Sequence, residues 1–208
     1  MKKEDSFNNL YKKVDATSKT RFHASRRLRL HGKSSTYIVV LISLGLILIS
    51  LMQAYNLGTN INSDKVGLIQ VFSAIAVLVY SLLIDKNDYS NLSEKMYSCA
   101  SQLGELKQKI HPHLENEHDS NLYDKFRNEY HSILKLYETH SNNDFRGDYI
   151  RAKLEMPENY VIKGKDWGLA KIHVYWSHLL DFSSYFAVIG VLGWVLCWLW
   201  FGDAPKNL

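Results

Sequence analysis

Three stretches of the chain are apolar and free of charged residues over lengths that match a lipid bilayer. The first covers residues 37–55, the second runs from Val66 to Ile84, and the third runs from Phe182 to Phe201. At about 1.5 Å per residue, a helix of about nineteen residues extends roughly 28 Å, close to the hydrocarbon thickness of a membrane. A buried core helix would explain one such run, but not three in 208 residues. The pattern therefore predicts an all-α integral membrane protein.

The segments between these runs indicate how the parts are arranged. Only residues 56–65 separate the first two runs, and a connection this short makes two helices antiparallel neighbours. We expect four parts: a basic amphipathic cytoplasmic helix at 1–35, a transmembrane hairpin at 36–85, a cytoplasmic helical domain containing a helical hairpin at 86–177, and a third transmembrane helix at 178–202.

The N-terminal part has the periodicity of an amphipathic helix. Its apolar positions are spaced i, i+3, i+4, i+7, at Phe7, Leu10, Tyr11 and Val14. Such a helix either lies on the inner leaflet through this face or packs on the rest of the cytoplasmic domain, and the sequence favours neither. We expect Gly32 to end it.

Beyond the second apolar run, apolar residues recur at alternating steps of four and three. They are Leu92, Met96, Cys99, Leu103, Leu106 and Ile110. This is the a/d pattern of a heptad repeat, and no proline precedes Pro112, so we expect one continuous helix from the second span through this seam. Leu92, Met96, Leu103, Leu106 and Ile110 are therefore the candidate cytoplasmic assembly seam. It packs either against copies from other chains or against a second helix of this chain bearing Leu122, Phe126, Tyr130, Ile133 and Tyr137.

The charge distribution predicts an orientation. The net charge is only +4, but residues 1–35 hold ten Lys and Arg against three Asp and Glu. Basic residues beside a first span are retained in the cytoplasm, so we expect a multi-pass membrane protein with the N-terminus and residues 86–177 cytoplasmic. The basic residues nearest the span would form a collar on anionic headgroups. They are Arg21, Arg26, Arg27, Arg29 and Lys33.

Small and polar residues within the spans allow two interpretations. They let helices of one hairpin pack closely, or they line a water-filled conduit between several subunits. The candidates are Ser43 and Ser50 in the first span and Gln70, Ser73 and Ser81 in the second. No Asp, Glu, Lys or Arg lies within a span, which argues against a proton-coupled transporter or a pump.

The sequence offers little for catalysis or cofactor binding. His111, His113 and His118 lie in the acidic, proline-containing segment "HPHLENEHD", but their spacing is loose for a zinc site, and we expect a solvated turn and no metal. Phosphate-binding loops, dinucleotide motifs and nucleophile elbows are absent from the sequence. We expect a protein that is not an enzyme and has no cofactor; an enzyme acting on lipid or nucleotide would have to use these three histidines. Cys99 and Cys197 are expected to be free thiols.

The order of parts resembles a known family. The basic segment "ASRRLRLHGKSS" precedes a two-span hairpin, "YSNLSEKMYSCASQLGELKQKI" follows it, and a later helix closes on "YETHSNNDF". This is similar to the SLATT family, two-span membrane effectors of prokaryotic conflict systems. The closing motif resembles the subtype often encoded beside reverse transcriptases. Residues 8–145 carry most of the resemblance.

The resemblance implies an oligomer that forms a pore in the inner membrane when a separate sensor detects phage, causing depolarisation and abortive infection. The implied partners are the lipid bilayer, other copies of the chain, and a sensor, reverse transcriptase or nucleotide-signal protein encoded nearby, without direct binding of nucleic acid. The alternative is a membrane-anchored interaction or scaffold module that recruits a cytoplasmic partner and forms no pore.

Overall fold

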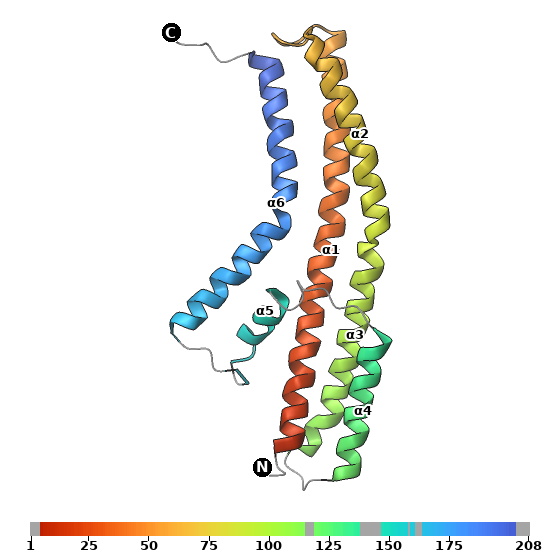
Figure 1. The fold of residues 1–208 in the computed structure, drawn as a ribbon, viewed down its shortest axis with the longest axis vertical. Helices are drawn as coiled ribbons and strands as arrows, with labels where there is room; N and C mark the ends of the chain where they lie inside the picture. Colours follow the sequence, from red (N-terminus) through yellow and green to blue (C-terminus); the bar gives the residue numbers. More distant parts are fainter. Residues whose placement is uncertain (1–4, 115–118, 138–146, 158, 161–163, 203–208) are drawn as a thin grey trace. The chain divides into compact units, whose positions relative to one another are not determined.

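The computed structural model describes residues 5–114, 119–137, 147–157, 159–160 and 164–202. Within these ranges every regular element is helical, as Figure 1 shows. The helices are α1 (Asp5–Ala54), α2 (Asp64–Asn87), α3 (Tyr89–Ile110), the 3₁₀ turn η1 (His111–His113), α4 (Ser120–Leu136), α5 (Tyr149–Leu154) and α6 (Lys165–Phe201). In this part of the chain three helical stretches, beginning at Phe7, Asp64 and Lys165, are long and apolar enough to cross a membrane. The chain is an all-α membrane protein, as predicted.

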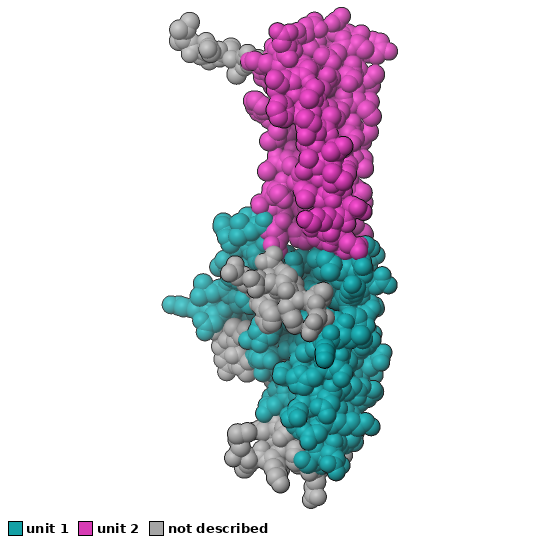
Figure 2. Space-filling model, turned by 45° about the vertical axis from the view of Figure 1, so that its right-hand side comes forward, with its two compact units in different colours: residues 1–29, 90–180 teal, residues 30–89, 181–208 magenta. Residues whose placement is uncertain are grey.

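The chain divides into two compact units, coloured separately in Figure 2. Unit 1 comprises residues 1–29 and 90–180, and unit 2 comprises residues 30–89 and 181–208. The boundaries expected from the sequence follow residues 35, 85 and 177, whereas the units divide after Arg29, Tyr89 and Leu180. Helices α1 and α6 each contribute residues to both units.

Unit 1 is built around a core shared by α1, α3 and α4. The apolar face of the first turns of α1 contributes Phe7, Leu10 and Val14 to it. Of the two interpretations of this face, the structure shows packing on the other helices of unit 1. Since these side chains are buried within the chain, they are not available to insert into a leaflet.

The heptad seam of α3 is the second wall of this core. Met96, Cys99, Leu103, Leu106 and Ile110 are buried, and Leu92 is half-buried. On α4 the predicted face packs against the same core through Phe126, Tyr130 and Ile133, with Leu122 and Tyr137 at its edge. The expected helical hairpin is present as α3 and α4, with α1 packed against it as a third helix. The seam is occupied within one chain, so contacts between copies through it would require this core to open.

Unit 2 packs the membrane part of α1 against α2 and α6. One cluster buries Ile49, Met52, Ile61, Val66, Val195 and Leu199, and a second buries Ile38, Ile42 and Tyr185. The turn between α1 and α2 also caps α6. Asn60 donates from its backbone N to the carbonyl of Leu199 at 3.3 Å and from Nδ2 to the carbonyl of Trp198 at 3.2 Å. Both carbonyls lie in the last turn of α6, where that of Trp198 also accepts from the backbone N of Gly202 at 3.0 Å, so the turn helps to hold the end of the third apolar helix.

Two helix boundaries differ from the sequence prediction. Gly32 does not end a helix, because α1 continues through it to Ala54. Glycine lowers helix stability by only about 1 kcal/mol, and here a Cβ would lie 3.3 Å from Cβ of Tyr89, so its small size serves close packing. We expected one continuous helix from the second span through the heptad seam. It is interrupted at Asp88, which has left-handed backbone angles of φ 39° and ψ 49° between α2 and α3.

Candidate functional site

Polar side chains join α1 and α2 near the turn that connects them. Gln70 donates from Nε2 to Oε1 of Gln53 at 2.9 Å and lies 3.5 Å from Oγ of Ser50. Two of the predicted conduit residues, Gln70 and Ser50, therefore meet. Gln53 was not expected from the sequence, although an amide one turn beyond Ser50 in an apolar run was a signal for it. Two paired amides hydrogen-bond to each other where lipid hydrocarbon offers no hydrogen-bond partner.

The other candidate conduit residues do not join this cluster. Ser43 donates to the carbonyl of Val39 and Ser81 to that of Val77, each at 2.8 Å, and Ser73 is half-buried. A serine that bonds to the carbonyl four residues earlier needs no partner on another helix. These residues are therefore compatible with lipid, protein or water as a neighbour.

The surface of α2 is largely uncovered. Among its described residues only Val66 is buried, while Leu68, Phe72 and Leu82 are exposed. A Cβ placed on Gly67 would meet nothing within 4 Å. Apolar side chains on such a surface require lipid or another protein surface around them.

A histidine joins α1 and α6 within unit 2. The ring of His31 stacks on Phe182 with a centroid distance of 4.4 Å and an interplanar angle of 6°. Nδ1 of His31 lies 3.2 Å from the hydroxyl of Tyr185, which in turn lies 2.8 Å from Oγ of Ser35. This contact was missed because His31 sits among arginines in the sequence, and its partners lie about 150 residues away.

The predicted basic collar is divided by the fold. Arg26, Arg29 and Lys33 are exposed, whereas Arg21 and Arg27 are only 3% and 7% exposed. Nη1 of Arg21 lies 3.0 Å from the sulfur of Met96, and Nε of Arg27 donates to Asp148 at 3.0 Å. Assigning Arg21 and Arg27 to lipid headgroups was wrong, because their side chains are enclosed within unit 1.

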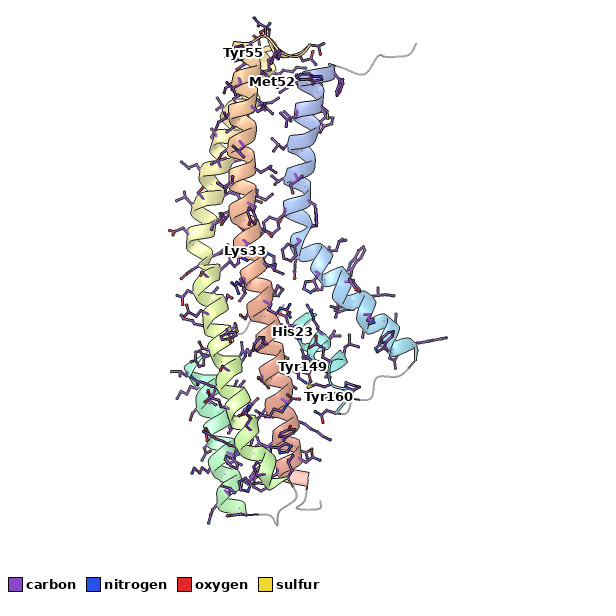
Figure 3. The ribbon with its side chains drawn as sticks, turned by 180° about the vertical axis from the view of Figure 1, so that it is seen from behind. His23, Lys33, Met52, Tyr55, Tyr149 and Tyr160 are labelled. Carbon is purple, nitrogen blue, oxygen red and sulfur yellow. The ribbon has the colours of Figure 1, made fainter. Side chains whose placement is uncertain are left out.

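Another buried titratable group of unit 1 is His23. Its Nε2 lies 2.9 Å from Oε2 of Glu155, and Nδ1 has no hydrogen-bond partner among the described residues. Burial lowers the pKa of His23 below its usual 6.5, although Glu155 opposes this effect. Figure 3 shows His23 on α1 on the side where α5 lies.

The histidine-containing turn carries no metal-ligand cluster in its described part. The rings of His111 and His113 lie 5.9 Å from that of Tyr11 and 6.3 Å from that of Phe7, so both cover the end of the unit 1 core. His118 lies outside the described residues. Within the described ranges no group of three or more histidine, cysteine or acidic side chains is arranged to hold a metal. Cys99 and Cys197 are free thiols, and burial raises the pKa of the Cys99 thiol.

A family model described as SMODS and SLOG-associating 2TM effector domain family 5, or SLATT_5, matches residues 3–199. The chain belongs to this family. SLATT proteins are membrane effectors of prokaryotic conflict systems. No curated protein and no solved structure matches the chain. The family match extends nearly to the end of α6, so this SLATT domain includes the third apolar helix in addition to the two in its description.

Proposed function

We propose that this SLATT protein is a non-enzymatic antiphage effector that oligomerises in the bacterial inner membrane and forms a pore when a separate sensor is triggered. The observation that carries the proposal is the uncovered surface of α2. Small residues at Gly67, Ala74 and Ser81 recur along this exposed helix at steps of seven. Such positions let helices of neighbouring copies approach closely in a bilayer.

The amide cluster gives the proposed pore polar groups that can be hydrated. In the chain alone, Gln70 bonds to Gln53 and Ser50, which satisfies polar groups in an otherwise apolar region. If assembled copies separate α1 from α2, these amides face the opening and exchange their mutual bonds for water. Polar groups at membrane depth are tolerated where they line a water-filled path.

Membrane potential in growing cells tests the proposal. Overproduction is expected to depolarise the inner membrane, as read by a potential-sensitive dye. Gln70→Leu should remove most of this effect, because leucine cannot be hydrated in the open state. The matched control is Val71→Leu, which changes an exposed apolar residue of the same helix and should leave depolarisation intact.

The competing function is a membrane-anchored scaffold that recruits a cytoplasmic partner. It is supported by the closed core of unit 1, which leaves the heptad seam inside one chain. Dye release from liposomes that contain the purified protein distinguishes a pore from a scaffold. A pore releases a small entrapped dye, and Gln70→Leu blocks the release. A scaffold releases no dye, keeps its cellular function with Gln70→Leu, and would overturn the pore proposal.

A further inference from the structure

Unit 1 contains a cavity that the proposed pore does not use. It has a volume of about 560 Å³, within the usual range for small-molecule sites, and lies where α1, α4 and the α5 segment meet. Its lining combines three cationic side chains of α1 with three tyrosines: Lys12, Lys13 and Arg21, and Tyr130, Tyr149 and Tyr160.

The tyrosines come from separate parts of the fold and are held in place. The hydroxyl of Tyr130 lies 3.1 Å from Oγ1 of Thr17. Tyr149 begins α5 and Tyr160 follows that helix, and Figure 3 shows both on the α5 side of α1. Burial raises the pKa of Tyr160, with neighbouring Tyr149 adding to the effect. These residues present ring surfaces together with hydroxyl donors.

The charge around the cavity is positive. Lys12 and Lys13 line it, and Lys153 beside it places Nζ 4.4 Å and 5.2 Å from the ring centroids of Tyr149 and Tyr160. No carboxylate lines the cavity within the described residues. Asp15 of α1 already bonds to Lys107 at 2.8 Å and to Lys19 at 3.3 Å.

From this juxtaposition we propose that the cavity binds a nucleoside phosphate. The base would stack on the tyrosine rings, and the phosphate would take charge-assisted hydrogen bonds from Lys12 and Lys13. A phosphate could also come from a lipid headgroup, which shares the anion but lacks the planar ring. The inference goes beyond the proposed pore, because it makes this chain itself a receptor for a small molecule. Binding requires neither oligomerisation nor conduction.

Photolabelling of the full chain in phosphatidylcholine nanodiscs tests the site, with 8-azido-ATP as the probe and mass spectrometry of the labelled peptides as the readout. Saturable labelling of peptides containing Tyr149 or Tyr160 is expected, with competition by ATP. The double variant Lys12→Gln, Lys13→Gln should raise the half-saturating concentration by about tenfold or more, as expected for loss of charge-assisted bonds. The matched control is Lys95→Gln, Lys125→Gln, which changes two exposed lysines of the same unit and should have no effect.

A second pair of variants isolates the ring contact. Tyr160→Phe keeps the ring and should retain labelling, whereas Tyr160→Leu should weaken it, with thermal unfolding showing that both variants fold. Labelling that does not saturate, lies outside the cavity, or is unchanged by the lysine variants would overturn the proposal. Displacement by inorganic phosphate or phosphatidylglycerol, but not by adenosine, would also overturn it and assign a plain anion or headgroup site. Conductance is not measured, so failure here leaves the pore proposal untouched.

Discussion

The guanidinium of Arg27 on α1 donates from Nε to Oδ2 of Asp148 at 3.0 Å, and both side chains are buried. Asp148 directly precedes α5, so this ion pair fixes the α5 segment on α1 within unit 1. Removing two charges from water is unfavourable, and the attraction between the partners offsets part of that cost in the interior. The free energy of unfolding should therefore depend strongly on this pair.

Asp148→Asn should therefore lower the free energy of unfolding by about 3–5 kcal/mol, the usual cost of leaving a buried charge without its partner. Denaturant unfolding of detergent-solubilised protein provides the measurement. The control is Asp124→Asn, which breaks an exposed contact of 3.5 Å with Arg127 and should cost at most about 1 kcal/mol. Equal small losses in both variants would show that the Arg27 pair is not a structural requirement.

The turn that caps α6 depends on Gly58. Its φ is 106°, and a Cβ would lie 2.6 Å from the carbonyl oxygen of Leu199, so Gly58→Ala should both strain the backbone and displace the capping turn. We expect a loss of about 1–3 kcal/mol in thermal unfolding experiments. Gly67→Ala is the matched control, because it has open space in a helix and should be neutral or slightly stabilising. A loss with Gly67→Ala as large as that with Gly58→Ala would contradict this explanation.

Stability should depend on pH through His23. Because burial lowers its pKa in the folded chain, the unfolded chain binds the proton more readily. The contribution of His23 is therefore fully present above pH 6.5 and is lost as the pH falls through the lower pKa of the folded state. Unfolding measured from pH 8 to pH 5 should show this decline, and His23→Gln should flatten it. An unchanged slope in His23→Gln would assign the dependence to other groups.

The predicted orientation can be checked with cysteine labelling. In a Cys99→Ala, Cys197→Ala background, the exposed residues Asn62 and Lys95 are replaced one at a time by cysteine. A membrane-impermeant maleimide should label Asn62→Cys in intact spheroplasts and Lys95→Cys only after permeabilisation, because basic flanks are retained inside. Labelling in the opposite order would invert the topology.

Periodic apolar patterns predicted the helices well. The seam of Met96, Leu103 and Ile110 reports a buried helix face directly, because burial repeats with the helical period. The same reasoning found the face of Phe7 and Leu10, but left open what covers it, since periodicity does not identify a partner. The third apolar helix was likewise expected from length and lack of charge alone.

Contacts between distant polar residues could not be predicted from the sequence. Arg27 looks like its exposed neighbours Arg26 and Arg29, and only the fold brings Asp148 to it. His31 is assigned to a basic segment by its neighbours, although its ring packs against Phe182. In both cases local composition describes the average of a segment, whereas the helix, with about 3.6 residues per turn, points neighbouring side chains to different sides.

The cap on α6 bears on how shortened versions of this protein should be designed. A fragment that stops after the first two apolar helices, as the family description would suggest, would strip Val195 and Leu199 from Ile49, Met52 and Ile61. The apolar side chains left behind would be exposed, and the backbone N of Asn60 would lose its bond to the carbonyl of Leu199. Toxicity or aggregation of such a fragment would then reflect the newly exposed apolar surface and not the behaviour of the whole chain.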